Sequence, residues 1–323
     1  MTEENIKYIQ AITIKKLWGE LDIYWELDPK VNILVGKNGV GKTTLLNLVE
    51  DIIELNLIED IIDEKYLVDP KFNFESVKID FDDNNYFFYH PKDQSIEAFS
   101  KEVNLCKIST FEMLVKDLQN QNYKKDENIK TELDYLLKGL IDDFKSYQLK
   151  LRNQEKEKTR DQDNEIKALS HKDSANAEEL SKLRELLQEK DDIIANINQN
   201  QNRFLELINK LFDDTNKKID FDKENSIIFR KYNDKTISAY QLSSGEKQIL
   251  IILLNILLQE NQPFIVLMDE PEISLHLTWQ FDLIRMIRTL NKNCQLIIAT
   301  HSPAIISKGF KDKVIDMKNI IKD

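Results

Sequence analysis

The chain has 323 residues, of which 41% are hydrophobic and 32% charged, and a formal net charge of −12. This length allows one long domain or two, and so many charges are expected when one segment is a solvated helix. The longest apolar run, Ile249 to Leu254, is too short to span a membrane, and the acidic, polar N-terminus differs from a signal peptide. The negative charge argues against nonspecific wrapping of nucleic acid, but it is compatible with a local basic groove or a basic partner.

The two cysteines, Cys106 and Cys294, lie in separate apolar stretches and lack the spacing of metal ligands. We expect both to be buried structural cysteines, without a disulfide framework or a metal site between them. Together with the missing membrane and export signals, this predicts a cytoplasmic protein with no membrane partner.

The first predicted elements are two half-exposed strands, over residues 6–19 and 21–27, in which apolar and polar residues alternate. An apolar strand over 31–36 ends at a glycine, and a helix is predicted over 43–58. Further strands are predicted over 72–81, 85–90 and 102–109. From residue 227 onward strand and helix alternate, and the apolar runs 262–269 and 294–300 are typical of buried parallel strands.

The middle of the chain contains no proline between Pro91 and Pro263. Its apolar residues recur at steps of three and four, a pattern typical of two coiled-coil helices. They are Leu133, Leu137, Leu140, Phe144, Tyr147 and Leu151, then Leu180, Leu183, Leu187, Ile194, Ile197, Phe204, Ile208 and Leu211. This spacing is lost between Gln154 and Asn176, so we predict an antiparallel hairpin whose tip lies in that region and whose arms are about 50 Å long. A compact helical lobe with a disordered loop is the alternative.

A glycine-rich motif follows the apolar strand and opens the predicted helix. It fits G-x-x-x-x-G-K-[ST], the loop that holds nucleotide phosphates with backbone amides and the positive end of a helix. Its residues, with the threonine that follows, are Gly36, Lys37, Asn38, Gly39, Val40, Gly41, Lys42, Thr43 and Thr44. Lys42 is expected to bridge the β- and γ-phosphates of ATP, and the Thr43 hydroxyl to ligate Mg²⁺.

A second motif is the apolar strand that ends in Asp269 and Glu270, the Walker B pattern. Asp269 is expected to hold Mg²⁺ as a hard oxygen ligand. Glu270 is the candidate that orients and deprotonates the attacking water. A third motif, Ser243-Ser244-Gly245, opens a long apolar helix, where it forms either an anion site or an ordinary helix cap.

These motifs, in this order, resemble those of the ABC ATPase superfamily. LSSGEKQ resembles its signature, DEPEISLHL its Walker B and D-loop, and ATHS its switch histidine. The resemblance implies that Ser243 and Gly245 contact the γ-phosphate bound by a second copy, that Ser274 lies at the dimer seam, and that His301 senses the γ-phosphate. Ser244 stands where the family has a glycine, and no Q-loop glutamine is located. Trp18 is interpreted as a partly buried strand residue, with stacking on adenine as the alternative.

The resemblance implies an α/β fold: an ABC-type P-loop NTPase head with a mixed β-sheet, interrupted by an α-helical antiparallel coiled-coil insertion. The head is predicted over 1–112 and 218–323, and the insertion over 113–217. Such insertions are similar to those of the RecF, SMC and OLD-like branch. The signature and Walker B wording resembles phage-defence ATPases such as the PtuA subunit of Septu and the ATPase of PARIS.

The leading hypothesis is a dimeric, Mg²⁺-dependent ATPase that gates a separate effector, a nuclease or toxin, in phage defence. The chain ends 22 residues after His301, so we expect the effector to be another chain. The alternative is a DNA-repair or recombination ATPase that acts directly on DNA. A transporter subunit is disfavoured by the long heptad insertion.

Overall fold

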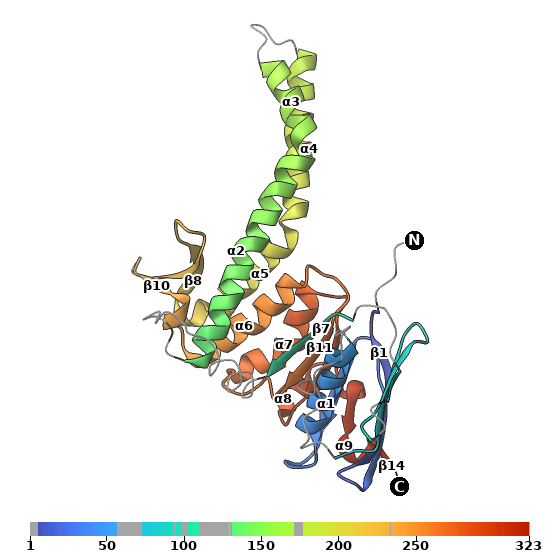
Figure 1. Cartoon of the computed structure of the whole chain (residues 1–323). Coiled ribbons are helices and arrows are strands. Elements are labelled where there is room, and N and C mark those ends of the chain that lie inside the picture. The colour runs from blue at the N-terminus through green and yellow to red at the C-terminus, as the bar shows by residue number, and fades with distance from the viewer. Residues whose placement is uncertain are drawn as a thin grey trace. The chain divides into compact units, whose positions relative to one another are not determined.

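The structure is a computed structural model that describes residues 6–56, 73–92, 95–97, 103–109, 129, 131–170, 177–232 and 234–322. By its internal contacts the chain divides into two units (Figure 1). The first unit contains residues 1–126, 244–252 and 261–323, and the second contains 127–243 and 253–260. The chain therefore enters the second unit and returns to complete the first.

The first unit contains a parallel sheet. Within the described residues its strand order is β13-β3-β12-β11-β7. The bounds are β3 Val31–Val35, β7 Leu105–Ser109, β11 Ile265–Asp269, β12 Gln295–Ala299 and β13 Val314–Asp316. Every residue of β12 is buried, as the apolar run predicts for a strand covered on both faces.

The other sheet of this unit is antiparallel, with strand order β14-β2-β1-β4-β5-β6 among the described residues. Its strands are β1 Ile9–Leu17, β2 Leu21–Glu26, β4 Ser76–Phe81, β5 Tyr86–His90, β6 Ser95–Glu97 and β14 Ile321–Lys322. The prediction of one mixed sheet is thus wrong. The alternating strands bury one face and pair with one another, whereas the continuously apolar strands form the parallel sheet.

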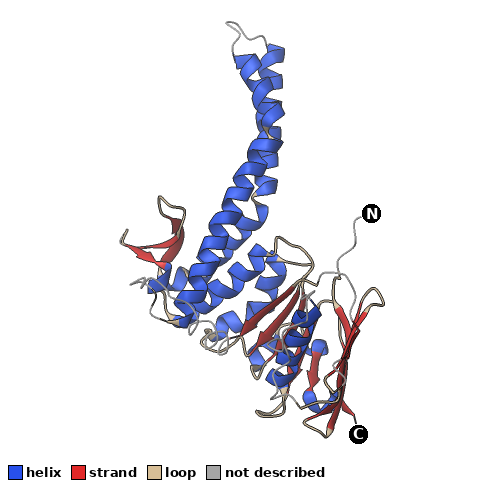
Figure 2. Cartoon of the chain, in the orientation of Figure 1, coloured by secondary structure: helices blue, strands red, loops and turns tan. Residues whose placement is uncertain are grey.

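Helix α1 (Lys42–Asn56) connects the two sheets by packing against β5 and against β7, β11 and β12. Its residues Leu45, Leu48, Val49 and Ile52 are fully buried in a core shared with both sheets. The unit also contains the first part of α6 (Ser244–Leu258), together with α7 (Leu277–Leu290), α8 (Pro303–Ser307) and α9 (Met317–Ile320). Figure 2 shows these helices and strands by type.

The second unit contains α2 (Glu132–Lys158), α3 (Arg160–Ser170), α4 (Ala177–Ile197) and α5 (Gln199–Leu211). They form two antiparallel arms, because Glu165 pairs with Lys182, Asp163 with Lys190 and Glu155 with Asn198. The chain reverses between α3 and α4, within the region predicted for the tip; residues 171–176 lie outside the described ones, as does most of 113–130.

Of the six apolar positions predicted in α2, four are buried, namely Leu137, Phe144, Tyr147 and Leu151, and two are half-buried. In α4 the predicted pattern is displaced, because Leu180 and Leu187 are 48% and 45% exposed while Leu186 is buried. The inward stripe of α4 runs instead through Leu183, Leu186 and Lys190. Lys190 is accommodated there because Asp163 of the opposite arm pairs with its ammonium group.

A small sheet closes the second unit, with strand order β10-β9-β8 among the described residues. Its strands are β8 Lys217–Phe221, β9 Ile227–Lys231 and β10 Thr236–Ser238. Phe221 stacks on Phe144 of α2, and Phe229 packs on Phe212 at the end of α5. Residues 218–243 therefore group with the helices, and the predicted boundary at 217 is corrected because these strands share the aromatic core of the helical unit.

Both cysteines are free; Cys294 is buried, as predicted, whereas Cys106 is only half-buried, so the prediction of burial is wrong for Cys106. Burial raises the pKa of the Cys294 thiol to about 11. In the part of the chain that is described, no helix is long and apolar enough to cross a membrane.

Candidate functional site

The glycine-rich loop joins β3 to α1. Gly36, Gly39 and Gly41 have φ values of 156°, 79° and 100°, which favour glycine because a Cβ is strained there. Space adds a second reason at Gly41, where a Cβ would lie 2.5 Å from Cη2 of Trp18. Trp18 is 40% exposed and lies after β1, in contact with this loop. The interpretation of Trp18 as a partly buried strand residue is therefore wrong: the strand ends at Leu17, and the exposed Trp18 side chain borders the site instead.

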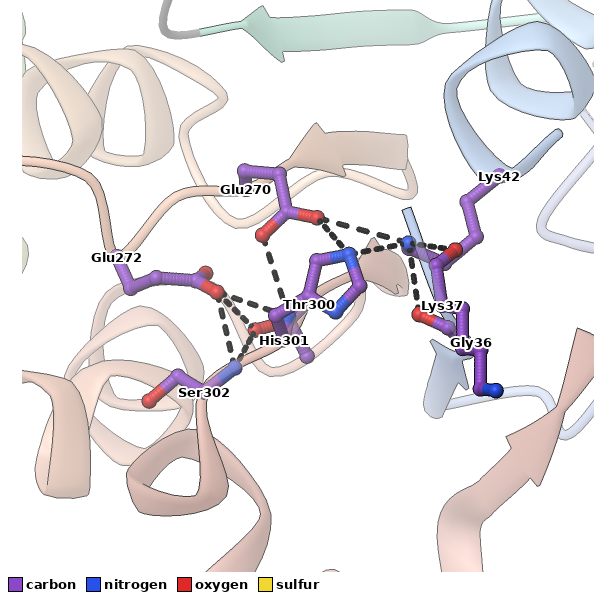
Figure 3. Close-up of polar contacts among 8 residues, drawn as sticks. All are labelled: Gly36, Lys37, Lys42, Glu270, Glu272, Thr300, His301 and Ser302. Carbon is purple, nitrogen blue, oxygen red and sulfur yellow. Dashed lines mark hydrogen bonds and ion pairs between the residues drawn. The ribbon is translucent and has the colours of Figure 1, made fainter. Parts of the chain in front are cut away.

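Lys42 begins α1, and its side chain is only 5% exposed. Its ammonium group donates to the Gly36 carbonyl at 3.1 Å and lies 2.6 Å from Nε2 of His301 (Figure 3). A lysine can only donate, so Nε2 accepts in this contact. Oε1 of Glu270 lies 3.8 Å from the same ammonium group. The structure thus brings together residues from the phosphate loop, the Walker B strand and the switch loop.

Glu270 directly follows β11 and has a φ of 45°, a left-handed conformation that is strained for a residue before proline. Its amide donates to the Ala299 carbonyl at 2.8 Å, and Oε2 accepts from the His301 amide at 3.2 Å. Burial, followed by a hydrogen bond and charge repulsion from Glu272, raises the pKa of Glu270 to about 7. Lys42 and the His301 amide oppose this rise.

The switch loop, Thr300 to Ser302, follows β12 and is held by Glu272. Oε1 of Glu272 accepts from the Thr300 hydroxyl at 2.6 Å, the His301 amide at 2.9 Å and the Ser302 amide at 3.0 Å. Glu272 is not among the site residues predicted from the sequence. The available signal was a second glutamate, two residues after Glu270, together with hydroxyl residues on both sides of the histidine.

A cavity of about 460 Å³ lies in front of the phosphate loop. Its lining residues are Trp18, Asn38, Gly39, Gly41, Lys42, Thr43, Thr44, Glu270, Ile273 and His301. The remaining predicted residues do not line it: Gly36, Lys37, Val40, Asp269, Ser243, Ser244, Gly245 and Ser274. Gly36 and Lys37 still reach Lys42 through their carbonyls, and Asp269 lies next to Glu270 at the end of β11.

The signature and the D-loop contact each other. Gly245 lies in the first turn of α6, and a Cβ there would lie 2.4 Å from the backbone oxygen of Ser274. Ser274 has a φ of 67°, so the D-loop turns sharply at this contact. Ser243 and Ser244 are exposed at the start of the helix. Absence of a side chain at residue 245 therefore allows the close approach of the two segments.

The cavity has the donors that a nucleotide phosphate requires. Glycines allow the backbone amides of such a loop to converge on an anion, α1 begins at the loop, and the Lys42 ammonium group contacts the loop at the Gly36 carbonyl. Thr43, which carries a hydroxyl, also lines this cavity. Lys42 has only partial charge compensation from Glu270 at 3.8 Å, so an anion beside it would be favourable. The residues present thus fit a nucleoside triphosphate.

Comparisons with known proteins agree with this assignment. A family model described as "AAA domain, putative AbiEii toxin, Type IV TA system" matches residues 31–307. The chain is similar to the "Retron Ec83 probable ATPase" of Escherichia coli, with 37% identity over 99 residues, 27% of this chain and 17% of that protein. It is also similar to the "Retron Vc95 probable ATPase" of Vibrio cholerae serotype O1 biovar El Tor, with 30% identity over 93 residues, 25% and 18% of the two proteins. The matches thus span less than a fifth of either relative.

Solved structures with a similar arrangement include the Smc head domain of Pyrococcus furiosus, with 15% identity, a TM-score of 0.45 and coverage of 96% of this chain and 93% of that one. The SMC head domain of Thermotoga maritima has 12% identity and a TM-score of 0.41, covering 93% and 91%. The recombination mediator RecF has 14% identity and a TM-score of 0.42, covering 93% and 94%. The family model itself spans the phosphate loop, Glu270 and His301, and the chain therefore belongs to this family of AAA-domain P-loop ATPases.

Proposed function

We propose that this chain is the ATP-hydrolysing switch subunit of a bacterial defence system. The observation that carries the proposal is the convergence of Lys42, Glu270 and His301 at one cavity, although they are up to 259 residues apart. Two matched relatives are named retron ATPases, and the family description names a toxin. These names support a role in defence.

Each residue at the cavity has a proposed task. The glycine loop and Lys42 hold the phosphates, and Thr43 and Asp269 hold Mg²⁺, which supplies charge neutralisation at the phosphates when bound. Glu270 positions a water and accepts its proton; a pKa of about 7 suits a base that acts near neutral pH. His301 contacts the γ-phosphate from the side of Lys42.

A second copy of the chain completes the site in this proposal. Ser243 and Ser244 are exposed at the start of α6, and the cavity lining includes neither. The start of a helix presents amide and hydroxyl donors to an anion. Ser243, Ser244 and Gly245 of one copy would therefore contact the phosphates held by the other, with Ser274 at the seam. ATP would close this homodimer, and hydrolysis would release it.

The helices α2 to α5 are proposed to form an antiparallel coiled coil that carries the state of the nucleotide to a separate effector, a nuclease or toxin. Cross-arm pairs such as Asp163 with Lys190 support this arrangement. The family description supports the type of effector.

The first test measures ATP hydrolysis and ATP affinity of the purified chain. We expect Glu270→Gln to lower the rate of ATP turnover by about 100-fold or more, while ATP binding is retained. Lys42→Ala should weaken ATP binding itself. Glu26→Gln, an exposed glutamate at the end of β2, is the matched control and should behave as wild type. A Glu270→Gln chain that turns over ATP normally would remove Glu270 from the proposed role.

The second test addresses the dimer. With Glu270→Gln and ATP, light scattering should detect a dimer, and adding Ser243→Arg should leave a monomer that still binds ATP. Normal hydrolysis by monomeric Ser243→Arg would contradict the shared site. The hydrolysis assay is also repeated with DNA added. A rate of hydrolysis that rises with DNA and falls steeply with salt concentration would favour the alternative, an ATPase that acts directly on DNA.

A further inference from the structure

We infer that Glu272 is a positioning residue that holds the switch loop so that the His301 ring lies between Lys42 and Glu270. The inference rests on the proposed ATPase function and deepens it, because it assigns a role to a residue of the DEPEISLHL segment that was given none from the sequence. Glu272 does not line the cavity, so it acts on the nucleotide only indirectly, through the loop and through its neighbour Glu270, whose pKa it helps to raise.

The first observation is the set of donors that one oxygen collects. Oε1 of Glu272 accepts from the Thr300 hydroxyl at 2.6 Å and from the His301 and Ser302 amides at 2.9 and 3.0 Å. Hydrogen bonds to a carboxylate are roughly twice as strong as neutral ones. Consecutive backbone positions of the loop are therefore tied to one side chain (Figure 3).

The second observation is that Glu272 and Glu270 meet at the same peptide. The His301 amide lies 2.9 Å from Oε1 of Glu272 and 3.2 Å from Oε2 of Glu270. The His301 ring makes different contacts, with Nε2 at 2.6 Å from Lys42 and 3.2 Å from Glu270. Glu272 thus fixes the backbone of His301 and leaves the ring to face the cavity.

The third observation is that Glu272 itself has a fixed position. It lies in a series of turns in which the Ile273 amide donates to the Glu270 carbonyl at 3.1 Å and the Leu275 amide to the Glu272 carbonyl at 2.9 Å. Gln280 of α7 then connects this turn to the loop, donating to the Leu275 carbonyl at 2.9 Å and accepting from the Ser302 hydroxyl at 2.7 Å. The loop is therefore connected by hydrogen bonds to this turn through both Glu272 and Gln280.

The test compares Glu272→Ala with Glu272→Gln in the full chain. Alanine removes the acceptor and leaves the loop amides without it, so we expect kcat to fall by about 10- to 100-fold. The Kd for ATP should change by less than about twofold, because the phosphate loop and Lys42 keep their own contacts. Glutamine keeps an oxygen acceptor in the same place and should retain kcat within about fivefold. Glu26→Ala serves as the exposed control.

Thr300→Val provides a second route, since it removes only the hydroxyl donor and keeps the branched shape. We expect a fall in kcat of a few fold, and no further fall when it is combined with Glu272→Ala, because both remove the same contact. A kcat for Glu272→Ala equal to that of wild type, or additive losses in the double variant, would overturn the inference. So would a loss of ATP affinity as large as the loss of kcat.

A readout that does not depend on hydrolysis separates this inference from the proposed function. Amide hydrogen exchange at His301 and Ser302 should accelerate in Glu272→Ala and stay slow in Glu272→Gln. If the wild-type chain has no ATPase activity, the proposed function fails, and the exchange experiment still decides whether Glu272 holds the loop. Unchanged exchange in Glu272→Ala would reject the inference by itself.

Discussion

Gln295 is a buried polar residue that joins the two sheets of the first unit. It is 0% exposed at the start of β12. Its side chain accepts from the Ile9 amide at 2.8 Å and donates to the Ile9 carbonyl at 2.8 Å and the Asp28 carbonyl at 2.9 Å. The amide group thereby pairs with the first residue of β1 as a neighbouring strand would. Gln295→Leu keeps the approximate size and removes these bonds.

The expected loss of stability can be worked from these contacts. Hydrogen bonds contribute about 1 kcal/mol each, and a buried group left unsatisfied costs about 1 to 3 kcal/mol. The Asp28 carbonyl keeps the Asn32 side-chain amide as a donor at 2.8 Å, so the main penalty falls on Ile9. We therefore expect Gln295→Leu to lower the free energy of unfolding by about 3 to 5 kcal/mol.

Tryptophan fluorescence in urea measures this unit selectively, because Trp18, Trp25 and Trp279 all belong to it. The matched control is Gln10→Leu, at an exposed position next to Ile9 in β1, which should change the free energy by less than about 0.5 kcal/mol. Amide exchange at Ile9 should also become faster in Gln295→Leu. A difference between the two variants below about 1 kcal/mol, with the Ile9 amide still protected, would refute the reasoning.

Two further predictions concern other parts of the first unit. Gly245→Ala places a Cβ 2.4 Å from the Ser274 oxygen, so we expect at least about a tenfold loss of ATP turnover. The control is Gly139→Ala, which should keep turnover because the added Cβ has no neighbour within 4 Å among the described residues. Equal turnover in the two variants would contradict the packing argument. Burial tends to raise the pKa of Asp28, but the hydrogen bonds from Lys313 and from the Lys30 and Val31 amides outweigh it and lower the pKa. A carboxyl group with a lowered pKa stabilises the fold at pH values above its ordinary pKa, so Asp28→Asn should lower the free energy of unfolding at neutral pH. Urea unfolding should show that the difference in free energy between wild type and variant shrinks below about pH 4. A difference that does not depend on pH would contradict the stabilising role of the Asp28 carboxylate.

The sequence by itself determined the local parts of the site. Gly36 to Thr43 specify a phosphate loop because glycines allow its backbone conformation, and a continuous apolar run specifies the buried strand that ends at Asp269. Alternation of apolar and polar residues likewise predicted the strands of the antiparallel sheet. These inferences succeed because the physical cause lies within a few neighbouring residues.

Tertiary structure alone decided the features that depend on distant partners. Gln295 stands in an apolar run, and its bonds to Ile9, 286 residues away, and to the Asp28 carbonyl explain the buried amide there. Glu272 acquires its place from Thr300 and the residues that follow it. The inward face of α4 follows Leu186 and Lys190 because Asp163 lies opposite, and residues 218–243 join the helices through Phe221 and Phe229. Periodicity cannot specify such contacts, because their energy comes from groups that meet only after the chain has folded.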